Sequence, residues 1–138
     1  MRAFLDANIL FSAAKSHGAI RELLRRLVDD GHECWVDDYV VIEARRNLDV
    51  KGPAALKVFE GLLTHLRVCP VQAPASPRPE LDWLPEKDRP VLAAAIRAQC
   101  EALVTGDRTH FGAGYGKTFG GVTIYSPRGL AEAIFGKR

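Results

Sequence analysis

Short hydrophobic runs alternate along the chain with segments that carry hydrophobic residues at helical spacing. Residues 3–5, 34–36 and 102–104 are apolar throughout, which is typical of strands buried on both faces of a sheet. Residues 67–71 predict a further strand, and residues 122–125 are rich in β-branched side chains and predict another. The pattern therefore predicts short strands spread over the whole chain.

Between these runs, hydrophobic residues recur at intervals of three and four, as on the buried face of a helix. This spacing predicts helices over residues 20–28, 39–48, 53–66 and 89–99, and a short helix that begins at Pro127. We expect Ser16 to cap the first of these helices and Asp88 the fourth. Asp37 is the expected cap of the second, with Asp38 as its solvated neighbour.

Strands that alternate with helices, and that are apolar on both faces, indicate a parallel sheet covered by helices, so the predicted fold class is α/β. The length of 138 residues fits one compact domain, which we expect to span residues 1–138. Four prolines between residues 70 and 79 predict a stiff connector that links two halves of this domain. Ligands of such sheets bind beyond the carboxyl ends of the strands.

The composition is that of an ordinary globular protein. Apolar residues make up 47% and charged residues 26%, and no run reaches the roughly 18 apolar residues of a membrane helix. The net charge of +2 is too small to indicate a nucleic-acid partner by itself. Cys34, Cys69 and Cys100 lie far apart, in or beside apolar stretches. We therefore expect buried thiols, without a disulfide or zinc, in a cytoplasmic protein.

Four carboxylates lie where predicted strands end or where helices begin beside them. Asp6 ends the first strand, and Asp107 follows the strand at residues 102–104. Glu43 and Asp88 belong to helices next to these strands. If the strands of Asp6 and Asp107 are neighbours, all four groups can share one cleft, where they repel one another unless a divalent cation neutralises them. The pattern predicts a site for Mg²⁺ or Mn²⁺, which suit oxygen ligands.

Each of these acids also has an ordinary structural explanation. Asp88 can be a helix cap, and Asp107 can form a turn. Glu43 can pair with the arginines that follow it in its helix. Asp6 is the hardest to explain in this way, because a carboxylate directly after a buried strand is costly to desolvate without a partner. The functional interpretation therefore depends on the four acids as a set.

The acids lie in four segments, which are residues 4–10 (FLDANIL), 41–43 (VIE), 87–96 (KDRPVLAAAI) and 103–107 (LVTGD). In this order, and over nearly the whole chain, the segments resemble the acidic motifs of PIN-domain ribonucleases, and the chain length is similar to that of the VapC-like toxins among them. The resemblance implies a parallel sheet of about five strands and a metal-dependent endoribonuclease. It also implies that Asn8 and Thr105 are small polar residues that support the site.

The resemblance further implies that Asp6, Glu43, Asp88 and Asp107 form the acidic quartet of the site. The expected reaction is in-line attack of a cation-activated water on an RNA phosphodiester. Asp6, Asp88 and Asp107 are the expected metal ligands, directly or through water. Glu43 orients the attacking water or completes the coordination shell.

The sequence departs from the family pattern after the last of these acids. Many members carry a further acid there, whereas this chain continues Arg108-Thr109-His110. A second metal is therefore left open, with the neutral hydroxyl of Thr109 as a weaker substitute for the acid. We expect His110 to form hydrogen bonds rather than to take part in catalysis.

Basic residues outnumber acidic ones from Asp107 to the C-terminus. Arg108 and Lys117 are candidates for contact with the RNA backbone, although solvated surface explains each of them equally well. The glycine-rich residues 112–118 are one residue short of a phosphate-binding loop and are followed by Phe119 rather than a helix. We expect a flexible loop there.

The leading interpretation is the toxin of a toxin–antitoxin pair that cleaves RNA. The resemblance also implies a small antitoxin in the acidic cleft and a homodimer, for which the helices at residues 21–30 and 53–66 could serve as the contact. A housekeeping RNA-processing nuclease and a non-catalytic scaffold that binds RNA or protein stay open as alternatives. A phosphatase of the haloacid dehalogenase type fits poorly, because Asn8 stands where that chemistry needs a second aspartate. A Rossmann module lacks its glycine fingerprint after the first strand.

Overall fold

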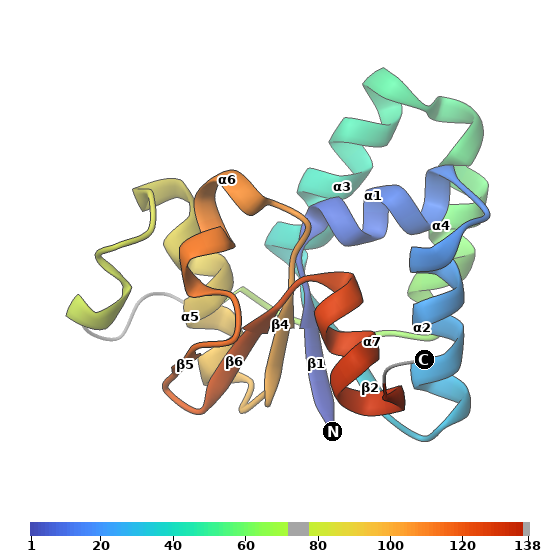
Figure 1. Cartoon of the computed structure of the whole chain (residues 1–138). Coiled ribbons are helices and arrows are strands. Elements are labelled where there is room, and N and C mark those ends of the chain that lie inside the picture. Colours follow the sequence, from blue (N-terminus) through green and yellow to red (C-terminus); the bar gives the residue numbers. More distant parts are fainter. Residues whose placement is uncertain (72–77, 137–138) are drawn as a thin grey trace.

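One sheet of six strands lies at the centre of the protein (Figure 1), in a computed structural model that describes residues 1–71 and 78–136. The strands are Arg2–Leu5 (β1), Glu33–Asp37 (β2), Arg67–Cys69 (β3), Ala102–Val104 (β4), Thr118–Phe119 (β5) and Val122–Tyr125 (β6). Their order across the sheet is β3-β2-β1-β4-β6-β5. All neighbouring strands run parallel except β5, which is antiparallel to β6. The predicted α/β class is confirmed.

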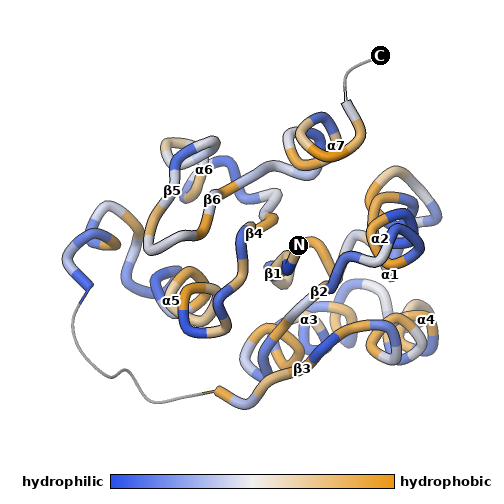
Figure 2. Tube along the Cα trace, turned by 90° about the horizontal axis from the view of Figure 1, so that it is seen from below, coloured by the Kyte–Doolittle hydropathy of each residue, from blue (hydrophilic) through white to orange (hydrophobic). Residues whose placement is uncertain are grey.

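Helices cover both faces of this sheet. The α-helices are Ala7–Lys15 (α1), Ala19–Asp29 (α2), Asp38–Lys51 (α3), Leu56–Leu63 (α4), Arg89–Arg97 (α5), Arg108–Phe111 (α6) and Pro127–Phe135 (α7). Short 3-10 turns are Pro53–Ala55 (η1), Pro79–Leu81 (η2), Glu86–Asp88 (η3) and Gly112–Gly114 (η4). Figure 2 shows α2 and α7 on one face and α3 and α5 on the other. Helix α1 lies at the carboxyl ends of the strands, in contact with α2, α3 and α4 (Figure 1).

The central strands are buried on both sides by these helices. Phe4 and Leu5 of β1, Leu103 of β4 and Ile124 of β6 have no exposed surface. Burial of a side chain of this size contributes roughly 1.5–3 kcal/mol to stability. The apolar runs along the sequence are therefore strands of a covered parallel sheet, as predicted.

Helix α1 was absent from the sequence-based prediction. The helix begins immediately after β1, and Asp6 is its N-cap. The carboxylate of Asp6 accepts a hydrogen bond from the backbone N–H of Ala7. Ile9 and Leu10 are buried on its inner side. The prediction that Ser16 caps the next helix was also wrong. Ser16 ends α1, and α2 begins after Gly18 without a side-chain cap. The predicted cap of α3 is confirmed, since Asp37 accepts a hydrogen bond from the N–H of Val40 at 2.9 Å.

The glycine-rich residues 112–118 contain secondary structure that the sequence did not predict. They form η4 and lead into the edge strand β5, which pairs with β6 through the turn at Gly120 and Gly121. Both glycines have positive φ values, 55° and 85°, which side chains with a Cβ rarely adopt. A strand of two residues is too short to show an alternating pattern, so β5 was not predicted from the sequence.

Several other expectations concern the thiols and the chain ends. Cys34 and Cys100 are buried as predicted, whereas Cys69 is half-buried, and all three are free. Pro74 and Pro77 of the predicted connector lie outside the described residues, as do the last two basic residues of the chain, at 137 and 138. Within the described part, no helix has the length and apolar character needed to cross a membrane.

A close packing contact links the segment before α5 to the segment after α6. Gly114 lies so near Trp83 that a Cβ at this position would be 2.4 Å from the indole ring. Trp83 also stacks on Phe119, with ring centroids 5.1 Å apart. The contact holds together two segments that carry Asp88 and Asp107.

We predict that Gly114→Ala lowers the free energy of unfolding by roughly 1–3 kcal/mol, because the indole ring has to move out of a packed core. Gly61→Ala is the matched control, since a Cβ there meets no atom within 4 Å and alanine favours a helix by up to about 1 kcal/mol. Urea denaturation of both variants measures the difference. Equal stability of the two variants would contradict the packing argument.

Candidate active site

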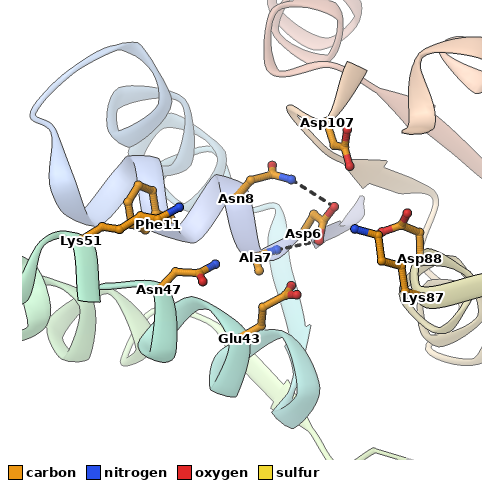
Figure 3. Close-up of a pocket in the computed structure, with 10 residues that line it drawn as sticks. All are labelled: Asp6, Ala7, Asn8, Phe11, Glu43, Asn47, Lys51, Lys87, Asp88 and Asp107. Carbon is orange, nitrogen blue, oxygen red and sulfur yellow. Dashed lines mark hydrogen bonds between the residues drawn. The ribbon is translucent and has the colours of Figure 1, made fainter. Parts of the chain in front are cut away.

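The four predicted carboxylates line one cleft at the carboxyl edge of the sheet. Asp6 directly follows β1, and Asp107 follows β4, its neighbour in the sheet. Glu43 extends from α3, and Asp88 from the last position of η3, directly before α5. The cleft has a volume of about 300 Å³, and Figure 3 shows the four side chains gathered around it. The structure thus brings together the acids that the sequence singled out, while their roles stay predictions.

Asp6 is the most buried of the four acids, with 6% of its surface exposed. Its Oδ1 accepts a hydrogen bond from the N–H of Ala7 at 2.8 Å. Its Oδ2 accepts one from Thr105 Oγ1 at 2.8 Å and one from Asn8 Nδ2 at 3.2 Å. Burial nevertheless raises the pKa of Asp6, and the negative charge of Asp88 adds to the rise. This carboxylate is held firmly in place.

Asn8 and Thr105 connect the two strand ends. The fully buried Thr105 hydroxyl also accepts hydrogen bonds from the N–H of Asp107 at 3.1 Å and from Asn8 Nδ2 at 3.3 Å. Asn8 Oδ1 accepts a hydrogen bond from the N–H of Gly106 at 2.8 Å. The side chains of the β1–α1 junction are therefore bonded to the backbone after β4. This geometry is that of two residues which support the site.

Asp88 faces the cleft and does not cap α5, so the predicted cap was wrong. Its backbone is already helical, with φ −98° and ψ −15°, because η3 leads directly into α5. The side chain consequently makes no capping bond. Its Oδ2 is buried and has no hydrogen-bond partner, and burial raises the pKa of the group. His110 and Lys87 act in the opposite direction through their charge.

His110 lies between two of the acids. Its Nδ1 is 2.7 Å from Asp107 Oδ2 and 3.3 Å from Asp88 Oδ2. Its backbone N–H donates to Asp107 Oδ1 at 3.1 Å, so Asp107 caps α6. The expected hydrogen bonding of His110 is confirmed. Thr109, the suggested substitute for a further acid, is exposed and does not line the cleft.

Glu43 lies on the face of α3 that borders the cleft. Asn47 and Lys51 follow it at intervals of four residues and line the same cleft (Figure 3). Burial raises the pKa of Glu43, and the charges of Asp6 and then Asp88 raise it further. Of the two arginines proposed as alternative partners, Arg45 binds Glu60 at 2.9 Å instead, while the charge of Arg46 lowers the pKa of Glu43.

The sequence analysis missed five residues that line the cleft, namely Ala7, Phe11, Asn47, Lys51 and Lys87. Asn47 and Lys51 could have been found from Glu43, since residues four apart share one face of a helix. Phe11 depends on α1, which was not predicted. Arg108 and Lys117, the suggested RNA contacts, are exposed and lie outside the lining of the cleft.

The residues of this site fit a divalent cation. Asp88, Asp107 and His110 each place one ligand atom within 4.8 Å of the others. The buried Oδ2 of Asp88 has no hydrogen-bond donor, although a buried carboxylate oxygen normally has one. A cation would satisfy this oxygen and offset the repulsion among the acids. The fold and the site together define an acidic centre at the edge of an α/β sheet, with residues that fit a divalent cation.

Comparison with known proteins identifies the family. The sequence profile of the PIN domain matches residues 2–109, which contain all four acids, so the chain belongs to the PIN-domain family. Among solved structures, the chain is similar to a chain of VapBC2 from Rickettsia felis, crystallised bound to a DNA fragment from its promoter. The identity is 17% and the TM-score 0.69, over 91% of this chain and 98% of the other, which shows a shared fold. No curated protein matches the chain.

We predict that Glu43→Gln raises the melting temperature of the metal-free protein at pH 8, because the amide removes a charge that faces Asp6 and Asp88. The pKa of Glu43 is raised by folding. Its stabilising contribution is therefore complete below the unfolded pKa of about 4.3 and is lost as the pH rises through the folded pKa. The gain from the variant should thus vanish near pH 4.

Thermal melts in EDTA between pH 4 and pH 8 measure this difference. Asp49→Asn is the control, since Asp49 is exposed on the same helix and does not line the cleft. A difference between wild type and Glu43→Gln that is the same at both ends of the pH range would contradict the electrostatic explanation.

Proposed function

We propose that the chain is a metal-dependent endoribonuclease and the toxin of a toxin–antitoxin pair. The observation that carries the proposal is the cleft in which four carboxylates meet and one buried oxygen, Asp88 Oδ2, has no hydrogen-bond partner. The PIN-domain membership and the fold shared with a chain of VapBC2 support it.

Mg²⁺ or Mn²⁺, when bound, would offset negative charge that builds on the phosphate during hydrolysis. Asp88 and Asp107 would hold the ion, and Asp6 would act beside them. Asn8 and Thr105 fix Asp6 through the hydrogen bonds described above. These contacts hold the acids in place before the substrate arrives.

Glu43 is the residue that we assign to the attacking water. Its carboxylate lines the cleft together with the other three acids, and the neighbouring Arg45 is bound to Glu60 instead. A general base works best when its pKa lies near the working pH, and the pKa of Glu43 is shifted upward, toward neutral pH. Glu43 would orient the water for in-line attack and accept its proton.

RNA is the proposed substrate, and the charge along the cleft supports a polyanion. Lys51 lies at one end of the cleft and Lys87 beside Asp88, where both can meet phosphate groups. Arg108 and Lys117 are exposed on the segments that follow β4 and would contact RNA outside the cleft. Positive residues on either side of the acidic centre would bind the phosphates of an RNA strand, and the bond between them would be cleaved at the centre.

A small antitoxin and a second copy of the chain are the proposed protein partners, and the cytoplasm is the proposed location. The fold shared with a chain of the VapBC2 complex supports the antitoxin. A mass measurement in solution that returns only monomer would refute the homodimer. A housekeeping nuclease differs from a toxin in that no antitoxin would be encoded next to it.

We predict metal-dependent cleavage of a cellular RNA pool by the purified protein in Mg²⁺ or Mn²⁺, abolished by EDTA. Asp88→Asn should lower the rate by about 100-fold or more, because it removes a proposed ligand of the ion. Asp82→Asn is the matched control, since Asp82 is exposed nearby and does not line the cleft. The absence of cleavage by folded wild-type protein would favour the non-catalytic scaffold.

We further predict that Lys51→Met weakens binding of single-stranded RNA. Measured in Ca²⁺, the logarithm of affinity should fall less steeply with the logarithm of salt concentration, by about 0.7, as expected for one lost phosphate contact. Lys57→Met is the control, because Lys57 is exposed on α4 and outside the lining of the cleft. An equal effect of both substitutions would show that only general charge matters.

A further inference from the structure

The geometry points to His110 as a direct nitrogen ligand of the cation, which makes this centre prefer Mn²⁺ over Mg²⁺. The inference rests on the cation of the proposed function and names a ligand that the four acids do not include. It departs from the expectation that His110 only forms hydrogen bonds.

The first step of the argument is the position of the imidazole. Nδ1 of His110 faces both Asp107 Oδ2, at 2.7 Å, and Asp88 Oδ2, at 3.3 Å. Ligand atoms bound to one metal ion at about 2.0–2.2 Å lie roughly 3–4 Å from one another. The three atoms lie within 4.8 Å of one another, so small side-chain rotations bring them to these separations.

The second step concerns the orientation of the side chain. His110 stands three residues after Asp107 in the first turn of α6, where its backbone N–H donates to Asp107 Oδ1. The helix therefore holds the imidazole against the carboxylate that it contacts. The Oδ2 of Asp88 on the other side is buried and has no hydrogen-bond partner. A metal ion bound at Nδ1 would replace the proton that Nδ1 shares with Asp107 Oδ2, leaving the imidazole neutral with its proton on Nε2, and would supply the partner that Asp88 Oδ2 lacks.

The third step separates Asp6 from this ligand set. Asp6 lies outside the group whose ligand atoms are all within 4.8 Å of one another in the described part of the chain, whereas His110 belongs to it. We therefore assign His110 to direct contact with the ion beside Asp88 and Asp107.

The fourth step is the choice of metal. Mg²⁺ binds oxygen ligands almost exclusively, whereas first-row transition ions accept imidazole nitrogen readily. A set of two carboxylates and one imidazole therefore favours Mn²⁺ over Mg²⁺. Nitrogen coordination also leaves a direct spectroscopic signature, because the ¹⁴N nucleus couples to the unpaired electrons of bound Mn²⁺.

The experiment uses the full chain, stripped of metal and titrated with Mn²⁺ or Mg²⁺ by calorimetry, with pulsed EPR of the Mn²⁺ form. We expect ¹⁴N modulation from imidazole in the wild type and its loss in His110→Gln. Mn²⁺ binding by this variant should weaken by about tenfold or more, and Mg²⁺ binding by less than about threefold. His65→Gln is the control, since His65 is exposed on a distant turn after α4.

A second variant separates a ligand from a structural residue. His110→Asp replaces the nitrogen with oxygen, so it should lose the ¹⁴N signal, bind Mg²⁺ more tightly than the wild type and still bind Mn²⁺. If His110→Gln weakens Mn²⁺ and Mg²⁺ binding equally, and His110→Asp restores binding of neither ion, His110 has a structural role and the inference is overturned.

Two further outcomes distinguish this inference from the proposed function. If wild-type protein binds Mn²⁺ and cleaves RNA but shows no ¹⁴N modulation, the assignment of His110 fails and the nuclease stands. If wild-type protein binds neither ion and does not cleave RNA, both proposals fail together.

Discussion

The hydroxyl of Thr105 joins the two strand ends on which the whole site depends. Leu5 of β1 lies opposite Val104 of β4, so the residues that follow emerge side by side at one edge of the sheet. The hydroxyl donates to Asp6 and accepts from the backbone of Asp107, with no exposure to water. A buried hydroxyl left without these partners would cost roughly 1–3 kcal/mol. The positions of two acids are therefore set by the sheet itself.

The carboxylates at this edge oppose one another in the folded state. Burial is the largest cause of the raised pKa of Asp6, Glu43 and Asp88, and the neighbouring acids contribute to each rise. Lys87 and His110 offset part of this charge at Asp88. A divalent cation would offset more, because its charge acts on all the acids at once. The repulsion that folding creates here would therefore favour the binding of a cation in the cleft.

Most of the fold could be predicted from periodicity, because the central strands and the long helices bury apolar faces. Helix α1 could not, since Phe11 and the buried Ile9 and Leu10 leave no polar face in its middle turn. Strand β5 was missed because it has two residues and depends on a turn of two glycines. Local rules were too weak in these places, and tertiary contacts decide the structure.

The site residues that follow strand ends could be predicted from the sequence. The residues whose role depends on the direction of a side chain could not. Asp6 and Asp107 could be placed together because parallel strands end at one edge. The capping role given to Asp88 failed because η3 makes its backbone helical before α5 begins. The place of His110 depends on α6, a helix of four residues that leaves no pattern in the sequence.

Helix α3 gives the cleft a direction. Glu43, Asn47 and Lys51 line it at intervals of four residues, which correspond to about 6 Å along the helix axis. The lining therefore changes from acidic to neutral to basic along one helix face. A polyanion placed along α3 would meet Lys51 with one phosphate and the cation centre with another. The small net charge of the chain conceals this arrangement, because what guides a charged strand is the local order of charges along the cleft.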